Sequence, residues 1–173
     1  NVCIIAVKTG GNSPLPRFGH SITFYAKDKV CLFGGATGTT GQFSITDNTY
    51  TLDLTTKIGG KSKVKAIIFS NWSITCCQSS SWCSLHIANK IVIYGGATGS
   101  GGLASDELFH LDIKDGVGTW NTIGVSQKTP GKRYGHTLTY SKPFLIVFGG
   151  NIGDRAVNDC WILNIEQKPL IWT

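Results

Sequence analysis

Methionine and long hydrophobic runs are both missing from the chain. None of the 173 residues is methionine, and no stretch reaches the roughly 18 consecutive apolar residues that a transmembrane helix needs. No basic-then-apolar segment of the signal-peptide kind opens the chain, which begins at Asn1. We therefore expect a cytoplasmic protein that can also enter the nucleus, and we expect the chain to be one piece of a longer polypeptide.

Charge is scarce and unevenly placed, which argues against nucleic acid and membrane partners. Charged residues make up 15% of the chain, and one short stretch supplies four of its basic residues: Lys57, Lys61, Lys63 and Lys65. We interpret this stretch as a solvated loop or an irregular segment, because no aromatic residues alternate with its lysines as single-strand binding would require.

Catalytic patterns are missing from the sequence as well. No Ser/His/Asp, Cys/His or paired-carboxylate set recurs, so we expect no enzyme activity from this chain.

The six cysteines do not form a recognisable metal site. Cys3, Cys31 and Cys160 lie in apolar, strand-like runs, where a free cysteine behaves as a small buried hydrophobe. The other three form a cluster with a histidine: Cys76, Cys77, Cys83 and His86. Zinc sites usually pair their ligands as Cys-x-x-Cys, and this cluster lacks that spacing. We expect no metal ion and no cofactor in this chain.

The chain does contain an internal repeat. Apolar residues lead three times into a pair of glycines: Gly34-Gly35, Gly95-Gly96 and Gly149-Gly150. The pairs lie 61 and 54 residues apart, which is typical of repeats that each form one supersecondary unit. Glycine at the end of a strand permits positive φ and the close approach of another backbone segment.

Three further marks recur in the same order around the glycine pairs. After each pair comes an acidic or amide residue, and the second residue beyond it is aromatic: Tyr50, Phe109 and Trp161. A tryptophan follows eleven residues later in two copies, at Trp120 and Trp172. Two pairs are preceded by Arg-aromatic-Gly-His, a motif that contributes Arg17 with His20 and Arg133 with His136. We expect the large aromatic side chains to fill the gaps between neighbouring repeats.

Strand patterns dominate between these marks. A run, a turn and a returning run occur at 20–33 and at 136–148, and no window keeps the 3.6-residue period of a helix. Short strands in a repeat of roughly 50 residues predict an all-β propeller, which closes with about four to eight blades. The chain forms one domain, 1–173, with room for three or so blades at about 14–72, 73–128 and 129–173. We therefore expect an incomplete propeller.

One region, 59–86, is irregular. Neither the tryptophan nor the arginine motif stands there at the spacing of the other copies, and Lys61 occupies the tryptophan position. Two interpretations stay open, an insertion and an error in the gene model. The outer strand of the first blade and the opening strand of the second are therefore not predicted.

Together these marks resemble the Kelch repeat. In detail, the chain is similar to the amino-terminal Kelch domain of the PPKL-type serine/threonine protein phosphatases of plants and apicomplexan parasites, the brassinosteroid-suppressor-like group. The closer resemblance is carried by Leu32–Gly38 with its loop to Asn48, by Gly131–His136, and by Arg155–Ile165 running into Trp172. It covers about 14–57 and 87–173.

This resemblance implies a binding module within a larger phosphatase. The propeller would be six-bladed when whole, with the remaining blades and a phosphatase domain in the same polypeptide, and two metal ions would belong to that absent domain. The resemblance also implies that Arg17 and Arg133, helped by His20 and His136, line the propeller mouth and contact protein partners. The alternative role for these side chains is to cap strands and to hydrogen-bond the backbone between blades.

Two other functions stay open. The chain can be a stand-alone Kelch scaffold or a cytoskeleton-binding protein, which the sequence after Thr173 would decide. A more remote alternative is a propeller oxidase whose copper site would use His20, His136 and a nearby tyrosine, although no surrounding pattern supports it. Both alternatives share the predicted propeller.

Overall fold

The computed structural model describes residues 9–58, 61–65, 83–87, 90–99, 101–114 and 117–173. Strands and turns account for the secondary structure of these residues, without any helix among them. Accordingly, the described residues contain no helix with the length and apolar character needed to cross a membrane. The predicted all-β class is confirmed.

Fifteen strands follow one another along the described chain. In order they are β1 (Thr9–Gly11), β2 (Arg17–Phe18), β3 (Ser21–Ala26), β4 (Lys29–Phe33), β5 (Ala36–Thr39), β6 (Gln42–Ile45), β7 (Thr49–Ile58), β8 (Lys61–Lys65), β9 (Cys83–Ile87), β10 (Lys90–Tyr94), β11 (Leu108–Lys114), β12 (Val117–Ile123), β13 (Thr137–Ser141), β14 (Phe144–Asn151) and β15 (Ala156–Asn164). Both hairpins predicted from the sequence are present, as β3–β4 and β13–β14.

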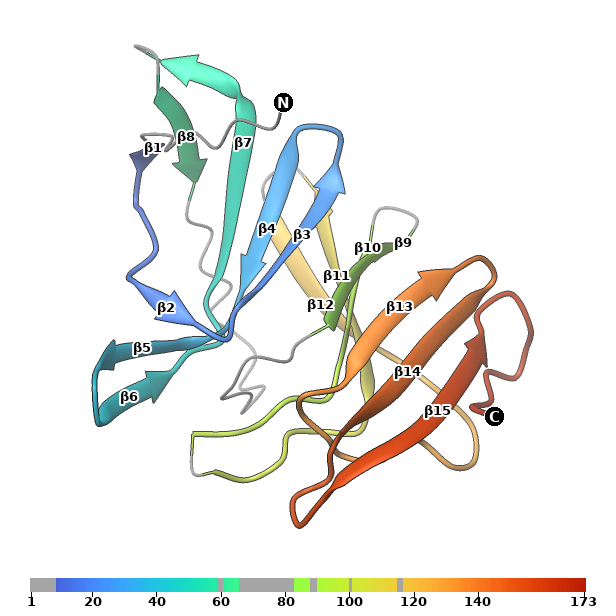
Figure 1. Ribbon diagram of the computed structural model, residues 1–173. Coiled ribbons are helices and arrows are strands. Elements are labelled where there is room, and N and C mark those ends of the chain that lie inside the picture. Colours follow the sequence, from blue (N-terminus) through green and yellow to red (C-terminus); the bar gives the residue numbers. More distant parts are fainter. Residues whose placement is uncertain (1–8, 59–60, 66–82, 88–89, 100, 115–116) are drawn as a thin grey trace, which may run out of the picture.

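Three of the sheets form blades that stand side by side (Figure 1). The first blade has the strand order β3-β4-β7-β8, with β1 paired in parallel to β8. The second has the order β9-β10-β11-β12, and the third β13-β14-β15. The opening strands of neighbouring blades meet, since β9 contacts both β3 and β13. This arrangement is the incomplete propeller that the repeat predicts, while the exact blade boundaries stay a prediction.

A small fourth sheet, called the arm here, joins β2, β5 and β6. It projects from the first blade and consists of the segment after Gly35 and the start of the Arg-aromatic-Gly-His motif (Figure 1). The pairing of β2 with β5 sets Arg17 opposite Thr37. The arm therefore lies next to the motif whose arginine and histidine were predicted to bind partners.

Apolar side chains pack between the blades, because each sheet turns one face to its neighbour. Cys31 and Phe33 of the first blade pack against Ile91, Ile93 and Trp120 of the second. A second cluster joins the second and third blades and contains Val92, Tyr94, Leu108, Leu138, Leu145, Val147, Leu163, Leu170 and Trp172. The prediction that aromatic residues fill the gaps between blades is confirmed, since the Phe33 and Trp120 rings lie 5.1 Å apart and those of Tyr94 and Trp172 5.8 Å apart.

Strand β10 is buried on both faces. Alternate residues of a strand point to opposite sides, so Ile91 and Ile93 contact the first blade while Val92 and Tyr94 contact the third. All four side chains are buried. This double burial distinguishes β10 from β4 and β14, whose sequences are equally apolar but whose burial alternates along the strand.

The three glycine pairs share one backbone conformation; the first two follow β4 and β10, and the third lies near the end of β14. The first glycine of each pair has φ between 65° and 69°, and the second has φ between 93° and 110°. Positive φ of this size favours glycine, which agrees with the prediction of a sharp exit from each blade.

Three expectations need correction, and one cannot be assessed. Cys160 is exposed rather than buried, because it points away from the second blade; Cys31 is buried as predicted. The lysine-rich stretch forms the end of β7 and all of β8 rather than a loop. The third glycine pair lies inside β14, which continues to Asn151, instead of ending its strand. The cysteine cluster falls mainly outside the described residues, which exclude 66–82.

Candidate partner-binding site at the glycine-pair end of the blades

Arg133 lies where several acceptors converge at the start of the third blade. Its Nη1 donates to the carbonyl oxygen of Gly149 at 2.8 Å, and its Nε donates to that of Pro130 at 3.1 Å. Nη1 and Nη2 also bind the two carboxylate oxygens of Asp159, at 2.7 and 3.0 Å. The residue is only 1% exposed. Arg133 therefore ties the opening turn to the glycine pair and to β15 through a planar, bidentate arrangement that a lysine would not reproduce.

The Arg133 guanidinium also holds the pKa of the Asp159 carboxyl at about 2, below its ordinary value of 3.8. The indole N–H of Trp161 donates to the same carboxylate, with Nε1 and Oδ2 2.7 Å apart. Because the folded-state pKa is depressed, the stabilisation from ionised Asp159 is complete at pH values above 3.8 and is lost as the pH falls toward 2.

Arg17 occupies the same place in the first blade but has different partners. Its Nη1 donates to the carbonyl oxygen of Gly34 at 2.8 Å, as Arg133 does to that of Gly149, and its Nε donates to that of Leu15 at 3.2 Å. Its guanidinium carbon lies 4.9 Å from the centre of the Tyr50 ring, a cation–π distance. Among the described residues, no carboxylate forms an ion pair with Arg17.

His136 joins the third blade to the second. Its ring lies edge-on to the Tyr94 ring, with 5.7 Å between the ring centres, and the residue is 3% exposed. Nearby, the backbone N–H of Gly96 donates to the carbonyl oxygen of Arg133 at 2.7 Å, and the Tyr94 hydroxyl donates to that of Gly131 at 2.9 Å. Burial, assisted by the Arg133 charge, lowers the pKa of His136 to about 4. At neutral pH His136 is therefore an uncharged side chain within a blade interface.

Mild acid should destabilise the fold through His136. His136 takes up a proton near pH 6.5 in the unfolded chain, but only near pH 4 in the folded chain. The stabilisation that comes from uncharged His136 is therefore complete above pH 6.5 and is lost as the pH falls toward 4. From the relation of 1.36 kcal/mol per pKa unit, we expect the free energy of unfolding to fall by about 2–3 kcal/mol between pH 7.5 and 4.5. Urea denaturation at both pH values measures this change. His136→Phe should remove most of it, and an unchanged pH dependence in that variant would contradict the assignment.

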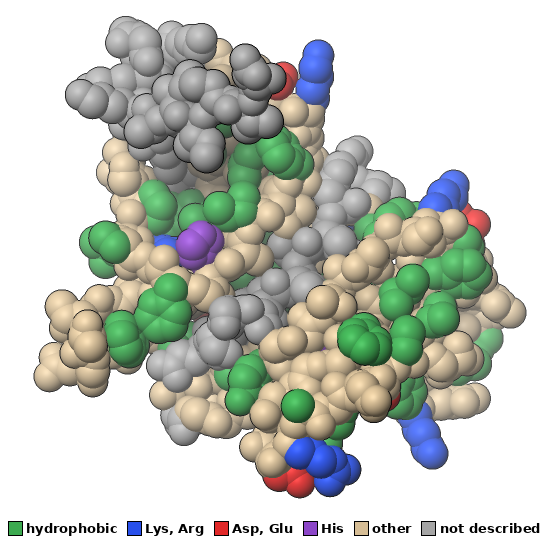
Figure 2. Space-filling model, viewed as in Figure 1, with side chains coloured by type: hydrophobic (Ala, Val, Ile, Leu, Met, Phe, Trp, Pro, Cys, Tyr) green, Lys and Arg blue, Asp and Glu red, His purple; other side chains and the backbone are tan. Residues whose placement is uncertain are grey.

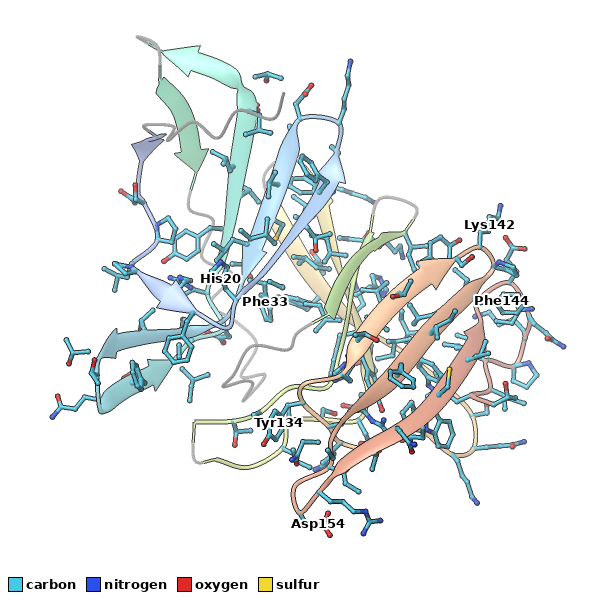
Figure 3. The ribbon with its side chains drawn as sticks, viewed as in Figure 1. His20, Phe33, Tyr134, Lys142, Phe144 and Asp154 are labelled. Atoms are coloured by element: carbon cyan, nitrogen blue, oxygen red, sulfur yellow. The ribbon has the colours of Figure 1, made fainter. Side chains whose placement is uncertain are left out.

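The corresponding motif of the first blade opens onto the surface. Phe18 and Phe43 form an edge-to-face pair with ring centres 4.9 Å apart, and they are 49% and 44% exposed. Leu15, whose carbonyl oxygen accepts from Arg17, is 66% exposed. Figure 3 places His20 where the first blade joins the arm, and Figure 2 shows hydrophobic side chains on the arm near a histidine. We call the set of Leu15, Arg17, Phe18, His20 and Phe43 the mouth patch.

The sequence model of the KLHDC2/KLHL20/DRC7 Kelch-repeats domain matches residues 2–173, including the irregular region 59–86. The chain belongs to this Kelch-repeat family. A Kelch-repeat domain implies protein–protein interaction. The predicted Kelch propeller is thereby confirmed at the level of family as well as of fold.

Relatives of this Kelch chain include proteins with quite different names. Serine/threonine-protein phosphatase BSL2 of Arabidopsis thaliana is 33% identical over 91 residues, 50% of the Kelch chain and 9% of that protein, which supports the resemblance to PPKL-type phosphatases. A probable serine/threonine-protein kinase of Dictyostelium discoideum is 32% identical over 164 residues, 91% of the Kelch chain and 11% of that protein. Adagio protein 3 of Arabidopsis thaliana is 27% identical over 173 residues, 93% of the Kelch chain and 25% of that protein.

A solved structure, that of YjhT, has the same fold. The TM-score is 0.61 at 19% identity, and the match covers 95% of the Kelch chain and 48% of the YjhT chain. At this identity the likeness shows the fold alone. The Kelch chain thus spans about half of a solved Kelch-like propeller and a quarter or less of the three relatives described above.

The four side chains predicted to bind partners do not form one site in the Kelch domain. Arg17 and His20 belong to the first blade, and Arg133 and His136 to the third; Figure 3 shows His20 and Tyr134 well apart. Arg133 and His136 have the geometry of the alternative role, strand capping and contact between blades. Arg17 also caps its strand but is only partly buried. Partner binding by these four residues stays a prediction.

Sequence reasoning missed Asp159 and Phe43 as parts of this region of the Kelch domain. Asp159 carried a signal, since an acidic or amide residue precedes the aromatic position in every copy, but the sequence does not say what that residue contacts. Phe43 carried no signal, because it lies in the arm. The backbone after the other two glycine pairs makes only shorter pairings, of Ala97 with Leu103 and of Asn151 with Tyr134 and Ala156.

Proposed function

We propose that this chain is a protein-interaction module, the regulatory and targeting Kelch domain of a serine/threonine protein phosphatase whose catalytic domain lies in the same polypeptide. Membership of the Kelch family supports the interaction role. The similarity to BSL2, which is named a serine/threonine-protein phosphatase, supports the link to that enzyme class. We also propose that the protein acts in the cytoplasm.

The observation that carries the binding role is the composition of the mouth patch. Exposed apolar patches on soluble proteins mark interaction sites, and Phe18, Phe43 and Leu15 supply such a surface. Arg17 precedes Phe18 in β2, and two of its five N–H donors bind carbonyl oxygens. A guanidinium next to exposed aromatic rings suits a peptide segment that carries a carboxylate close to an aromatic or aliphatic side chain.

Peptide selection tests this proposal. A displayed random peptide library selected on the chain should become enriched in segments that combine Asp or Glu with an aromatic residue. We expect Arg17→Ala and Phe43→Ala each to weaken binding of a selected peptide by tenfold or more, because a hydrogen bond to a charged group contributes about 1.5–3 kcal/mol and about 1.4 kcal/mol is tenfold in affinity. Titration calorimetry measures the loss. Val117→Ala, also at an exposed apolar side chain, is the matched control, and equal binding by Arg17→Ala would refute the assignment.

The phosphatase link is tested separately, by sequencing the full-length transcript beyond Thr173. We expect an open reading frame that encodes the Gly-Asp-x-His, Gly-Asp-x-x-Asp-Arg and Gly-Asn-His-Glu runs of a two-metal phosphatase. A frame that stops soon after Thr173, or that continues into unrelated sequence, would leave a stand-alone Kelch scaffold as the function.

A further inference from the structure

A cavity of about 210 Å³ lies between the second and third blades, which stand side by side in Figure 1. Eight of its eleven lining residues are aliphatic and come from both blades, among them Val92, Leu108, Leu145 and Leu163. Nearer the glycine pair, the rings of Tyr94 and Trp172 fill the gap between these blades. Farther along the interface the side chains are smaller, and they leave an apolar cavity.

Both walls of this cavity belong to the described chain, so the cavity does not depend on any further blade. Leu145 and Leu163 point to the second blade, whereas a blade that follows the third would pack on its opposite side. At Thr173 the backbone exchanges two hydrogen bonds with Ile162 and runs antiparallel to β15. The chain therefore points toward the start of β15, away from the cavity residue Lys168.

The interface between the first and second blades shows what fills the corresponding place. Cys31 and Val92 each stand three residues before their glycine pair. Two residues beyond the strand partner of each stand Tyr25 on β3 and Ile87 on β9. Tyr25 packs against the core that the first two blades share, and it forms a hydrogen bond with the Thr51 side chain. Ile87 is shorter and has no polar group, so the same place between the second and third blades stays open.

His110 is the counterpart of Thr51, because each pairs with the residue three positions before a glycine pair. Lys90 Nζ lies 3.1 Å from Nε2 of His110. Since an ammonium group only donates, Nε2 accepts this hydrogen bond and we assign the ring proton to Nδ1. Nδ1 is buried and has no hydrogen-bond partner among the residues that the structure describes. One residue that lines the cavity therefore has a buried N–H donor without an acceptor, which is costly in a protein interior.

The charged groups at the cavity leave one positive charge unbalanced. Lys90 forms an ion pair with Asp112, with Nζ and Oδ2 3.6 Å apart. Lys168 also lines the cavity and is exposed, and within the described ranges no carboxylate pairs with it. A single negative charge would balance this arrangement. The charge therefore fits a carboxylate better than a doubly charged phosphate.

We propose that this cavity binds a small monocarboxylate whose body is an apolar ring. An apolar cavity of roughly 150 Å³ takes up benzene, so a cavity of about 210 Å³ accommodates a ring with a short side chain. The ring would occupy the place that Tyr25 fills at the first interface, and the carboxylate would bind Lys168 and the N–H of His110. The proposal does not rest on the function proposed above, and the cavity shares no residue with the mouth patch.

Titration calorimetry with 3-phenylpropionate on the purified chain tests the proposal. We expect one saturable site with a dissociation constant below about 1 mM, a modest affinity for a ligand of this size. The uncharged alcohol 3-phenylpropan-1-ol has the same ring, and it should bind about tenfold more weakly because it lacks the charged acceptor.

Lys168→Gln tests the recognition of the carboxylate. We expect it to weaken binding of 3-phenylpropionate roughly threefold, the effect of an exposed charge pair, and to leave binding of the alcohol unchanged. Lys128→Gln is the matched control, since Lys128 is also exposed but does not line the cavity. It should bind both compounds as the wild type does.

Ile87→Tyr tests the location of the site. This substitution gives the second blade the side chain that fills the first interface, so it should abolish binding of 3-phenylpropionate. A cooperative thermal melt would show that the variant folds. If it does not fold, the comparison of Lys168→Gln with Lys128→Gln still decides whether the probe binds at this cavity.

Three outcomes would overturn the proposal. A wild-type chain without saturable binding of 3-phenylpropionate would show that the cavity is not a ligand site. Equal binding of the acid and the alcohol would show that the site does not select a carboxylate. A folded Ile87→Tyr variant that binds as tightly as the wild type would place the probe elsewhere on the molecule.

Discussion

Gly95→Ala is expected to lower the free energy of unfolding by about 2–5 kcal/mol, a large fraction of the stability of a typical domain. Gly95 has φ +69°, where an L side chain costs roughly 1–2 kcal/mol. A Cβ atom there would also lie 2.5 Å from the carbonyl oxygen of Arg133 and 2.7 Å from Cε1 of His136. These neighbours belong to the third blade, so relieving the clash would separate two blades, at a typical overpacking cost of about 1–3 kcal/mol.

Gly41→Ala is the matched control. Gly41 also has positive φ, +84°, but a Cβ atom there would meet nothing within 4 Å. We expect Gly41→Ala to cost about 1 kcal/mol from backbone conformation alone. Urea denaturation of the two variants measures the difference, which isolates the blade contact. Equal losses in the two variants would show that the approach of the third blade to Gly95 is not tight in solution.

Arg133→Ala is the second substitution with a large expected effect. Removing the guanidinium leaves the carbonyl oxygens of Gly149 and Pro130 and the carboxylate of Asp159 without their donor. Breaking a buried pair by removing one partner costs about 3–5 kcal/mol, and we expect the lower end because the Asp159 side chain is 39% exposed and water can reach it. At about 2–4 °C per kcal/mol for a chain of this size, the melting temperature should fall by about 6–12 °C.

Arg17→Ala tests whether that effect comes from burial or from the motif itself. Arg17 makes the equivalent hydrogen bond to the first glycine of its pair but is only partly buried and has no ion-pair partner among the described residues. We expect a loss of about 1 kcal/mol, the size of an ordinary hydrogen bond. Calorimetric melts compare the two variants directly. Similar melting temperatures would show that the Asp159 pair adds nothing to the third blade.

Much of the fold could be predicted because its marks repeat along the sequence. The glycine pairs located the ends of β4 and β10 and the last residues of β14, and a strand, a turn and a returning strand could be recognised in the first and third blades. The aromatic and tryptophan positions correctly predicted the contacts between blades, since a large side chain on an alternating strand must find a neighbouring surface. These repeated features are local sequence patterns, and a local pattern can be recognised in a single sequence.

The candidate site could be predicted only in part, because its properties depend on which blade neighbours which. Arg17 and Arg133 stand in identical local sequence patterns, yet one is partly exposed and the other is buried against an aspartate. Asn48 in place of Asp159 accounts for part of that difference, and the presence of a preceding blade accounts for the burial of His136. Cys160 was misplaced for the same reason, since an apolar run in an end blade has only one covered side.

The double burial of β10 has a consequence for how the molecule opens. An end blade loses one interface when it detaches, whereas detaching the second blade would expose Ile91 and Ile93 on one side and Val92 and Tyr94 on the other. In a stack where each unit contacts only its neighbours, stability is close to a sum of such interface contributions. Strand β10 should therefore leave its sheet only in the global unfolding transition.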